Sequence, residues 1–251
     1  MIQKIKQLIR PYFINYIARE IPLQWTQKKE DTQLVEWFGS TPSIKPPVSK
    51  FCTLIEKRAI ITNAQGEKPL WEGYQGATKK TRSSNQVRTQ PSMGNLFTHL
   101  VTLKKPQYAV EFGTAFGISG MYFLAGMEQV KQGQLLTFDP NDVWANLAKD
   151  NLSKISQRYQ LTIGTFEENI EKVLPSGASI DLAFIDAIHT REFVMPQLEI
   201  VLKYSKSGTI IIFDDINFSQ NMRDCWNDVA KDSRFSATVS CGDRVGVVEV
   251  K

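Results

Sequence analysis

The chain has few of the residues that build disulfide frameworks and zinc sites. Its cysteines are Cys52, Cys225 and Cys241, an odd number without CxxC spacing, so neither kind of site is indicated. No apolar run approaches the roughly 18 residues of a membrane span. The basic, amphipathic N-terminal segment lacks the continuous apolar core and small-residue cleavage site of a secretory signal. We therefore expect a cytoplasmic protein without a membrane span.

Positive charge is concentrated in the first part of the chain. Residues 1–108 carry 17 Lys/Arg against 7 Asp/Glu, a balance of +10, whereas residues 109–251 carry 13 against 19, a balance of −6. The basic residues are scattered singly and in pairs, not in the blocks typical of nucleic-acid-binding segments, so nucleic acid is not the expected partner. A polar segment that we expect to be a loop could attract an anionic substrate through four of them: Lys79, Lys80, Arg82 and Arg88.

A regular pattern begins at Gly94. Apolar strand candidates then alternate with helical stretches, which favours a parallel sheet covered by helices on both faces. The last two apolar segments are joined by a CGD turn, as in an antiparallel hairpin at a sheet edge. Residues 94–251 are therefore predicted to form an α/β, doubly wound, mostly parallel seven-stranded sheet with a C-terminal antiparallel hairpin. Residues 1–93 are predicted to be an irregular extension, with short helices near residues 2–20 and 31–39, that serves as a substrate lid or oligomer contact.

A glycine-bearing turn follows the first predicted strand of this domain, in the sequence EFGTAFGIS with Gly113 and Gly117. A P-loop would need a lysine and then serine or threonine after the glycines, and neither follows. The dinucleotide fingerprint would need glycines two and five residues after Gly113, where alanine and isoleucine stand. Ser119, at the expected helix start, can receive a carboxylate together with free backbone amides. Asp139, at the end of the next strand, is spaced to bind both hydroxyls of a ribose. The pattern indicates an adenosine-bearing cofactor.

Three acidic residues come at the ends of later strands. Asp186 ends DLAFID, and Asp214 and Asp215 end TIIIFDD, 28 and 29 residues further on. Ligands bind at the carboxyl ends of the strands in an open α/β sheet, so these carboxylates are expected to converge there. A divalent cation would remove their mutual repulsion, and oxygen ligands suit Mg²⁺ best. In the ordinary alternative, Asp214 caps a helix and Asp215 is solvated.

These segments resemble the class I S-adenosylmethionine-dependent methyltransferases over residues 94–251. The resemblance is closest to small-molecule O-methyltransferases of the catechol, caffeoyl-CoA and macrolide-sugar kinds. It implies that Glu111 faces the methionine amino group, Ser119 its carboxylate and Asp139 the ribose. It also implies that Thr165 and Phe166 flank the adenine. The metal-dependent members of the family use an Asp after the fourth strand and an Asp-Asp or Asp-Asn pair after the fifth, which here are Asp186, Asp214 and Asp215.

The resemblance implies methyl transfer from S-adenosylmethionine to a hydroxyl group of a small molecule, such as a secondary metabolite, with Mg²⁺ or another divalent cation. His189 stands three residues after Asp186, where catechol-type enzymes carry a catalytic lysine. An imidazole can take a proton near neutral pH, so His189 or an Asp such as Asp186 is the expected base. Homodimers are common in the resembled families. Two alternatives remain open: a metal-independent N-methyltransferase, and a non-catalytic cofactor-binding module of the same fold.

Overall fold

A computed structural model describes residues 17–74 and 79–251. The segment before the glycine turn contains β1 (Ile21–Lys28), α2 (Gln33–Phe38), β2 (Ser43–Ile44), α3 (Cys52–Asn63), β3 (Lys68–Pro69), β4 (Thr81–Arg82), α4 (Ser84–Val87) and α5 (Pro91–Lys104). The following elements are β5 (Tyr108–Phe112), α6 (Ile118–Val130), β6 (Gln134–Asp139), α7 (Asp142–Ser153), β7 (Tyr159–Ile163), α8 (Phe166–Val173), β8 (Ile180–Ile185), α9 (Arg191–Lys203), β9 (Ser205–Phe213), α10 (Gln220–Lys231), β10 (Phe235–Cys241) and β11 (Val245–Val250).

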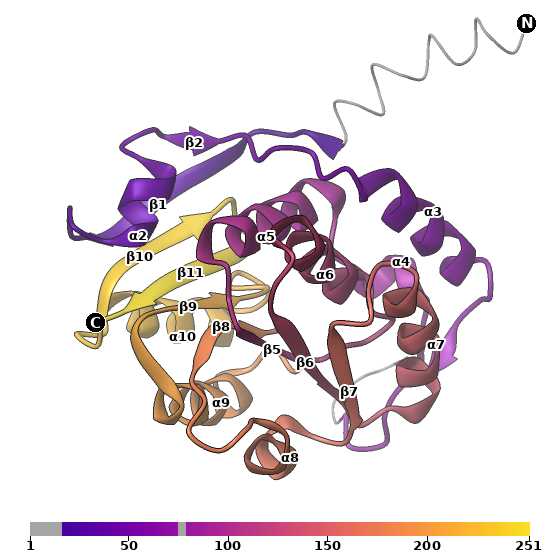
Figure 1. The fold of residues 1–251 in the computed structure, drawn as a ribbon. Helices are drawn as coiled ribbons and strands as arrows, with labels where there is room; N and C mark the ends of the chain where they lie inside the picture. The colour runs from indigo at the N-terminus through magenta and orange to yellow at the C-terminus, as the bar shows by residue number, and fades with distance from the viewer. Residues whose placement is uncertain (1–16, 75–78) are drawn as a thin grey trace, which may run out of the picture.

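The predicted α/β sheet is confirmed. The described strands form one nine-stranded sheet in the order β2-β1-β10-β11-β9-β8-β5-β6-β7, and a separate two-stranded ribbon pairs β3 with β4 (Figure 1). Strands β7, β6, β5, β8 and β9 run parallel to one another. Strand β11 runs antiparallel to β9 and to β10, which is the predicted C-terminal hairpin. The carboxyl ends of the parallel strands therefore meet at one edge of the sheet.

The prediction that this hairpin closes the sheet is wrong, because two strands of the extension continue it. Strand β1 pairs antiparallel with β10 from Leu23 opposite Cys241 to Lys28 opposite Ala237, and β2 pairs with β1. The sequence IPLQWTQK has the alternation of apolar and polar residues that a half-buried strand needs, and its side chains alternate in burial. We expected irregular structure there because the stretch is short and isolated from other strand candidates.

Two apolar cores lie on the two faces of the sheet. One contains residues from α2, α3, α5, α6 and α7, including Leu34, Ile55 and Phe97. The other contains residues from α8, α9 and α10, including Leu198 and Trp226. The sheet is therefore doubly wound, as its buried strands YAVEF and IDLAFI require. All three cysteines are free and buried.

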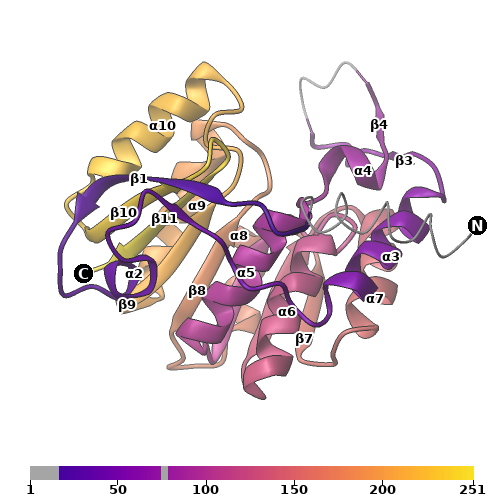
Figure 2. The ribbon, with the colours of Figure 1, turned by 90° about the horizontal axis from the view of Figure 1, so that it is seen from above.

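The extension crosses the face that carries α5 and α6 and reaches the far side of the fold (Figures 1 and 2). The predicted helix near residues 31–39 is present as α2, and the extension also contains α3. The predicted loop before Gly94 contains secondary structure: β4 pairs with Lys68 and Pro69, and α4 follows it. The helix predicted near residues 2–20 lies mostly outside the described residues. None of the described helices is long and apolar enough to cross a membrane.

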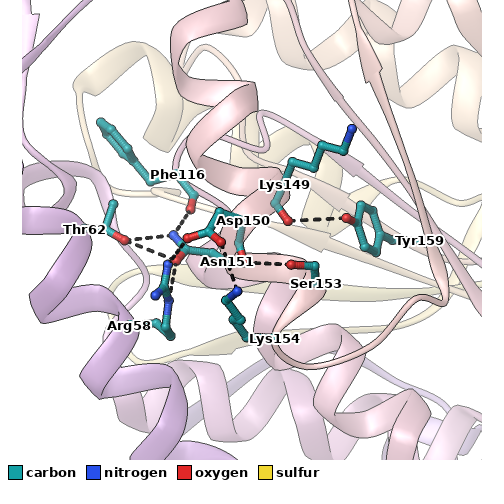
Figure 3. A network of polar contacts seen from close by, with 9 residues as sticks. All are labelled: Arg58, Thr62, Phe116, Lys149, Asp150, Asn151, Ser153, Lys154 and Tyr159. Atoms are coloured by element: carbon teal, nitrogen blue, oxygen red, sulfur yellow. Dashed lines mark hydrogen bonds and ion pairs between the residues drawn. The ribbon is translucent and has the colours of Figure 1, made fainter.

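A buried asparagine ties the extension to the glycine turn. Asn151 on α7 is fully buried, and its Nδ2 donates to the carbonyl of Phe116 at 2.8 Å and to Oγ1 of Thr62 at 2.9 Å. Its Oδ1 accepts from Nε of Arg58 at 2.9 Å, and the Arg58 guanidinium also pairs with Asp150 (Figure 3). Helix α3 is thereby bonded to α7 and to the backbone of the turn.

A second polar contact holds α2 to the sheet. Glu249 on β11 is buried, and its carboxylate accepts from the backbone N–H of Gln33 at 3.2 Å and of Leu34 at 2.9 Å. These N–H groups have no partner within the helix, because they lie in its first turn. The negative charge also suits the positive end of the helix dipole.

We predict that Glu249→Ala lowers the free energy of unfolding by about 1–3 kcal/mol, because it leaves two buried N–H groups without an acceptor. Urea denaturation followed by circular dichroism measures the change. Glu30→Ala is the matched control, since its side chain is 83% exposed. Equal losses in the two variants would show that the Glu249 contacts do not stabilise α2.

Candidate functional site

A cavity of about 320 Å³ opens at the carboxyl ends of the parallel strands. Seven of the predicted site residues line it: Gly113, Asp139, Thr165, Phe166, Asp186, His189 and Asp215. The other four do not. Glu111 and Asp214 are buried behind the wall, Gly117 packs against α7, and Ser119 lines a smaller hollow next to the turn. The cavity thus brings residues from five separate strand ends together.

The two glycines of the turn are required by close packing. A side chain on Gly113 would lie 2.3 Å from the carbonyl oxygen of Asp186, so the ends of β5 and β8 approach too closely for any other residue. A side chain on Gly117 would lie 3.0 Å from Cα of Ala148 on α7. Both glycines have a positive φ, of 88° and 79°. Gly113 lines the cavity, and Gly117 allows the start of α6 to pack closely against α7.

Asp139 bridges the glycine turn and the loop after β6. Its carboxylate accepts from the backbone N–H of Ala115 at 2.7 Å and of Asn141 at 2.8 Å. Burial raises the pKa of Asp139 to about 6, and the two N–H donors offset part of that rise. The carboxylate lines the cavity and is held in place by backbone, so it can accept hydrogen bonds from a ligand without rearranging.

Glu111 turns away from the large cavity. Its side chain is fully buried and accepts from Oγ of Ser119 at 2.6 Å and from Oγ1 of Thr137 at 2.7 Å. Burial raises the pKa of Glu111 to about 7, against the lowering effect of these two donors. The predicted contacts of Glu111 and Ser119 with an amino acid group remain predictions. In the described structure, the two side chains bind each other at the start of α6.

Aromatic rings form the floor and one side of the cavity. Phe166 packs between Phe112 and Phe138, with ring centroids 3.8 Å and 5.5 Å away, and is 2% exposed. Trp144 stacks on Phe116 at 4.7 Å. Thr165 occupies the N-cap position of α8, next to Phe166. A flat ring could therefore lie against apolar surface between the loops that follow β6 and β7.

Two polar atoms of the cavity residues are buried without a hydrogen-bond partner in the described part of the chain. They are Nε1 of Trp144, a donor, and Oε1 of Gln197, an acceptor. The amide of Gln197 is oriented by its Nε2, which donates to Glu167 at 2.8 Å. A buried polar group without a partner costs free energy, so a polar ligand that reached either atom would gain from the contact. An adenosine with its ribose and amino groups fits this combination of orphaned donor, orphaned acceptor, apolar wall and Asp139.

The three predicted acids do converge, but they converge on an arginine. Arg244 donates from Nε to Oδ1 of Asp214 at 2.9 Å and from Nη2 to Oδ2 at 2.6 Å. Its Nε also lies 3.2 Å from Oδ1 of Asp215. Among the described residues, no group of three or more His, Cys, Asp or Glu side chains is arranged to hold a metal ion. The alternative, in which Asp214 caps a helix and Asp215 is solvated, does not include this ion pair either.

Burial and charge separate the pKa values of the acids. Burial, and next the charge of Asp214, raise the pKa of Asp186 well above its ordinary value. Burial acts in the same direction on Asp214, but the hydrogen bonds and charge of Arg244 outweigh it and hold the pKa of Asp214 below its ordinary value. Burial and then Asp214 raise the pKa of Asp215. The cluster therefore holds its negative charge most firmly on Asp214.

His189 lies between two of these acids. Its Nε2 is 3.4 Å from Oδ2 of Asp215 and 3.7 Å from Oδ1 of Asp186. Its ring packs against Phe218 with centroids 5.5 Å apart, and its side chain is 17% exposed in the cavity wall. The imidazole therefore lies in the cavity wall with two acidic side chains within ion-pair distance of one nitrogen, where it could contact a ligand in the cavity.

The extension contributes residues that sequence reasoning missed. Trp71 and Tyr74, after β3, line the cavity, and Pro69 holds them near the site because its carbonyl accepts from Nδ2 of Asn141 at 2.9 Å. Arg244 was also missed, because its CGDR segment signals only a hairpin turn. The pairing of β11 with β9 is needed to find it.

Of the four cations proposed to meet an anion, one lines the large cavity. Arg82 does so, while its Nη1 donates to the backbone carbonyls of Lys79 and Thr81. Lys79 is exposed and pairs with Glu67, and Lys80 is exposed. Arg88 pairs with the buried carboxylate of Glu56 at 2.9 Å and lines the smaller hollow.

Several known proteins are similar to part of this chain. A family model described as "Methyltransferase domain" matches residues 110–216. A putative O-methyltransferase of Mycolicibacterium smegmatis is 29% identical over 161 residues, which are 61% of this chain and 72% of the relative. A probable O-methyltransferase of Mycobacterium tuberculosis is 28% identical over 142 residues, 55% of this chain and 60% of the relative.

Solved structures share the fold. The O-methyltransferase of Bacillus cereus in complex with SAH has a TM-score of 0.61 at 20% identity, over 79% of this chain and 91% of that one. The O-methyltransferase TomG of Streptomyces achromogenes, in complex with SAM, has a TM-score of 0.60 at 15% identity, over 88% and 96%. The likeness extends beyond residues 110–216 and includes much of the extension.

The buried carboxylate of Glu111 gives a prediction for stability. Its pKa is about 7 in the folded chain and about 4.5 in the unfolded one. As pH rises through this window, the unfolded state releases the proton first, so the free energy of unfolding falls with rising pH. Glu111→Gln removes this titration, and its stability should fall less between pH 4.5 and 7 than that of the unmodified chain.

Urea denaturation at a series of pH values measures this slope. Glu168→Gln, on the exposed side of α8, is the control and should keep the original slope. If Glu111→Gln and Glu168→Gln had the same pH dependence, Glu111 would be ionised at no cost in the fold.

Proposed function

We propose that this chain, a class I S-adenosylmethionine-dependent methyltransferase, transfers the methyl group to a hydroxyl oxygen of a small molecule. The observation that carries the proposal is that His189 and two carboxylates line the same cavity as Asp139, Trp144 and Phe166, which form its adenosine-compatible side. The relatives named above are described as a putative and a probable O-methyltransferase, and the two solved structures as O-methyltransferases, which supports oxygen as the acceptor atom.

The cofactor would lie across the ends of β5, β6 and β7. Asp139 would accept hydrogen bonds from the ribose hydroxyls, and the base would lie against Phe166 and Trp144 near the orphaned acceptor of Gln197. When bound, S-adenosylmethionine supplies an electrophilic methyl group on a sulfonium ion. The role of this chain is to align the acceptor oxygen with that methyl group and to exclude water.

The acceptor would lie on the side of the cavity formed by the acidic cluster and the extension. His189 would take the hydroxyl proton, and the resulting imidazolium would be stabilised by Asp215 and Asp186 at 3.4 and 3.7 Å. The oxygen then forms a bond to the methyl carbon while the carbon–sulfur bond breaks. Phe218, whose ring centroid lies 5.5 Å from that of His189, provides apolar surface on this side, which favours an acceptor with a flat or apolar body.

A divalent cation is the expectation that the sequence raised for this site. The fit is poor, because both oxygens of Asp214 already accept from Arg244 and Asp215 lies against the same guanidinium. Mg²⁺ demands oxygen ligands at about 2.0–2.1 Å in near-octahedral geometry, which these pairings prevent. The proposed mechanism therefore routes no step through a metal ion.

We predict that S-adenosylmethionine binds while NADH does not, and that its affinity depends on Asp139. An ionised carboxylate accepts from both ribose hydroxyls, so lowering the pH below the Asp139 pKa of about 6 should weaken binding. Between pH 7.5 and 5 the dissociation constant should rise roughly tenfold, in proportion to the loss of the ionised form.

Titration calorimetry of the full chain measures this dependence. Asp139→Asn should bind at least roughly tenfold more weakly at pH 7.5, from the loss of charge-assisted hydrogen bonds, and should lose the pH dependence. Asp142→Asn, three residues away and exposed, is the control. Wild-type affinity in Asp139→Asn would remove this residue from the cofactor site.

We predict that His189→Ala lowers the rate of methyl transfer by about 10²–10⁴-fold, the usual contribution of a general base. The affinity for S-adenosylmethionine should stay within about twofold, since the imidazole contacts the acceptor side. The assay follows labelled methyl groups into a panel of hydroxylated aromatic and alicyclic small molecules, with the rate expressed per folded molecule.

His99→Ala is the matched control, because His99 is the other histidine and lies on α5. A purely structural role of His189 would lower thermal stability but leave the turnover of the folded fraction unchanged. That outcome would assign proton removal to another group.

A further inference from the structure

We infer that Arg244 is the resident cation of the acidic cluster and supplies the positive charge that a metal ion would otherwise bring beside the acceptor oxygen. Its effect on the reaction rests on the proposed function, whereas its effect on the cluster does not. Arg244 is therefore a positioning residue for Asp214 and Asp215, and its charge keeps the site free of divalent cations.

The contacts are those of a bidentate ion pair. The guanidinium donates to both oxygens of Asp214 at 2.9 and 2.6 Å, and its Nε lies 3.2 Å from Asp215. A planar guanidinium fork matches a carboxylate in this way, and it stays charged at any pH at which the protein is folded. Asp214 is 2% exposed, so its charge depends on this partner.

Strand pairing fixes the arginine in this position. In the antiparallel register of β11 on β9, Gly246 lies opposite Phe213, which sets the residues before Gly246 against those after Phe213. The backbone N–H of Ile216 donates to the carbonyl of Arg244 at 2.9 Å. The main chain of Arg244 is thus bonded next to the two acids, and the guanidinium needs little further ordering to reach them.

Arg244 also lines the cavity. Its side chain is 36% exposed, whereas Asp214 is 2% exposed and does not line the cavity. A cation placed there would favour the negative charge that develops on the acceptor oxygen as its proton leaves. Three carboxylates meet at this point, so loss of Arg244 would leave an uncompensated cluster of oxygens that a divalent cation could fill.

The test is Mn²⁺ binding by the full chain, measured from the electron paramagnetic resonance signal of free Mn²⁺. The unmodified chain should leave Mn²⁺ free at concentrations on the order of 1 mM, while Arg244→Ala should bind one Mn²⁺ at least about tenfold more tightly, because its carboxylates are released. Arg244→Lys keeps the positive charge and should behave like the unmodified chain.

Arg234→Ala is the matched control, since Arg234 also bridges two carboxylates, those of Asp232 and Glu199, away from the cavity. It should gain no Mn²⁺ affinity. Tight Mn²⁺ binding by the unmodified chain would overturn the inference, as would an Arg244→Ala variant that is folded and binds Mn²⁺ no better. If Arg244→Ala does not fold, Arg244→Gln, which keeps the side-chain length, decides by the same criterion.

S-adenosylmethionine binding in the same samples separates the two proposals. All folded variants should bind it within about twofold of the unmodified chain, because Arg244 lies on the acceptor side. Failure of every sample to bind it would refute the proposed function and leave the Mn²⁺ result to decide the role of Arg244. Loss of methyl transfer in EDTA by the unmodified chain would overturn the inference.

Discussion

The close approach of β5 and β8 is the constraint on which the cavity depends. A Cβ atom at position 113 would lie only 2.3 Å from the carbonyl oxygen of Asp186, so the two strand ends lie closer together than a residue other than glycine would allow. This contact sets the glycine turn directly beside the strand that carries Asp186. The adenosine-compatible side and the acidic side of the cavity are therefore neighbours, which is the arrangement that direct transfer between two bound molecules requires.

The two sides hold their carboxylates by different means. Asp139 is bound by backbone N–H groups of the turn and of its own loop, so its position follows from the main chain. Asp214 is bound by the side chain of Arg244, which directly precedes β11 near the C-terminal end of the sequence. In the first arrangement each oxygen accepts one backbone N–H and the carboxylate itself lines the cavity. In the second, both oxygens accept from a guanidinium, and the positively charged residue lines the cavity instead.

Sequence reasoning reached the parallel part of the fold because its strands are buried on both faces and read as unbroken apolar runs. The same logic located Asp139, Asp186 and His189 at strand ends, and these line the cavity. It failed for β1, whose half-buried pattern is short, and for Arg244, whose role depends on the pairing of β11 with β9. Trp71 lies near the site because the carbonyl of Pro69 accepts a hydrogen bond from Asn141, a contact that no local sequence pattern predicts.

Strand β1 has a consequence for the behaviour of the chain in concentrated solution. Strand β10, FSATVSC, carries no charge, and without β1 its open row of N–H and C=O groups would invite pairing with other chains. Strand β1 satisfies that row, and the two-residue strand β2 pairs in turn with Ile21 and Pro22 of β1. On this side the described sheet therefore ends in a very short strand beside one that ends at Lys28, and short or lysine-bearing edges disfavour edge-to-edge aggregation.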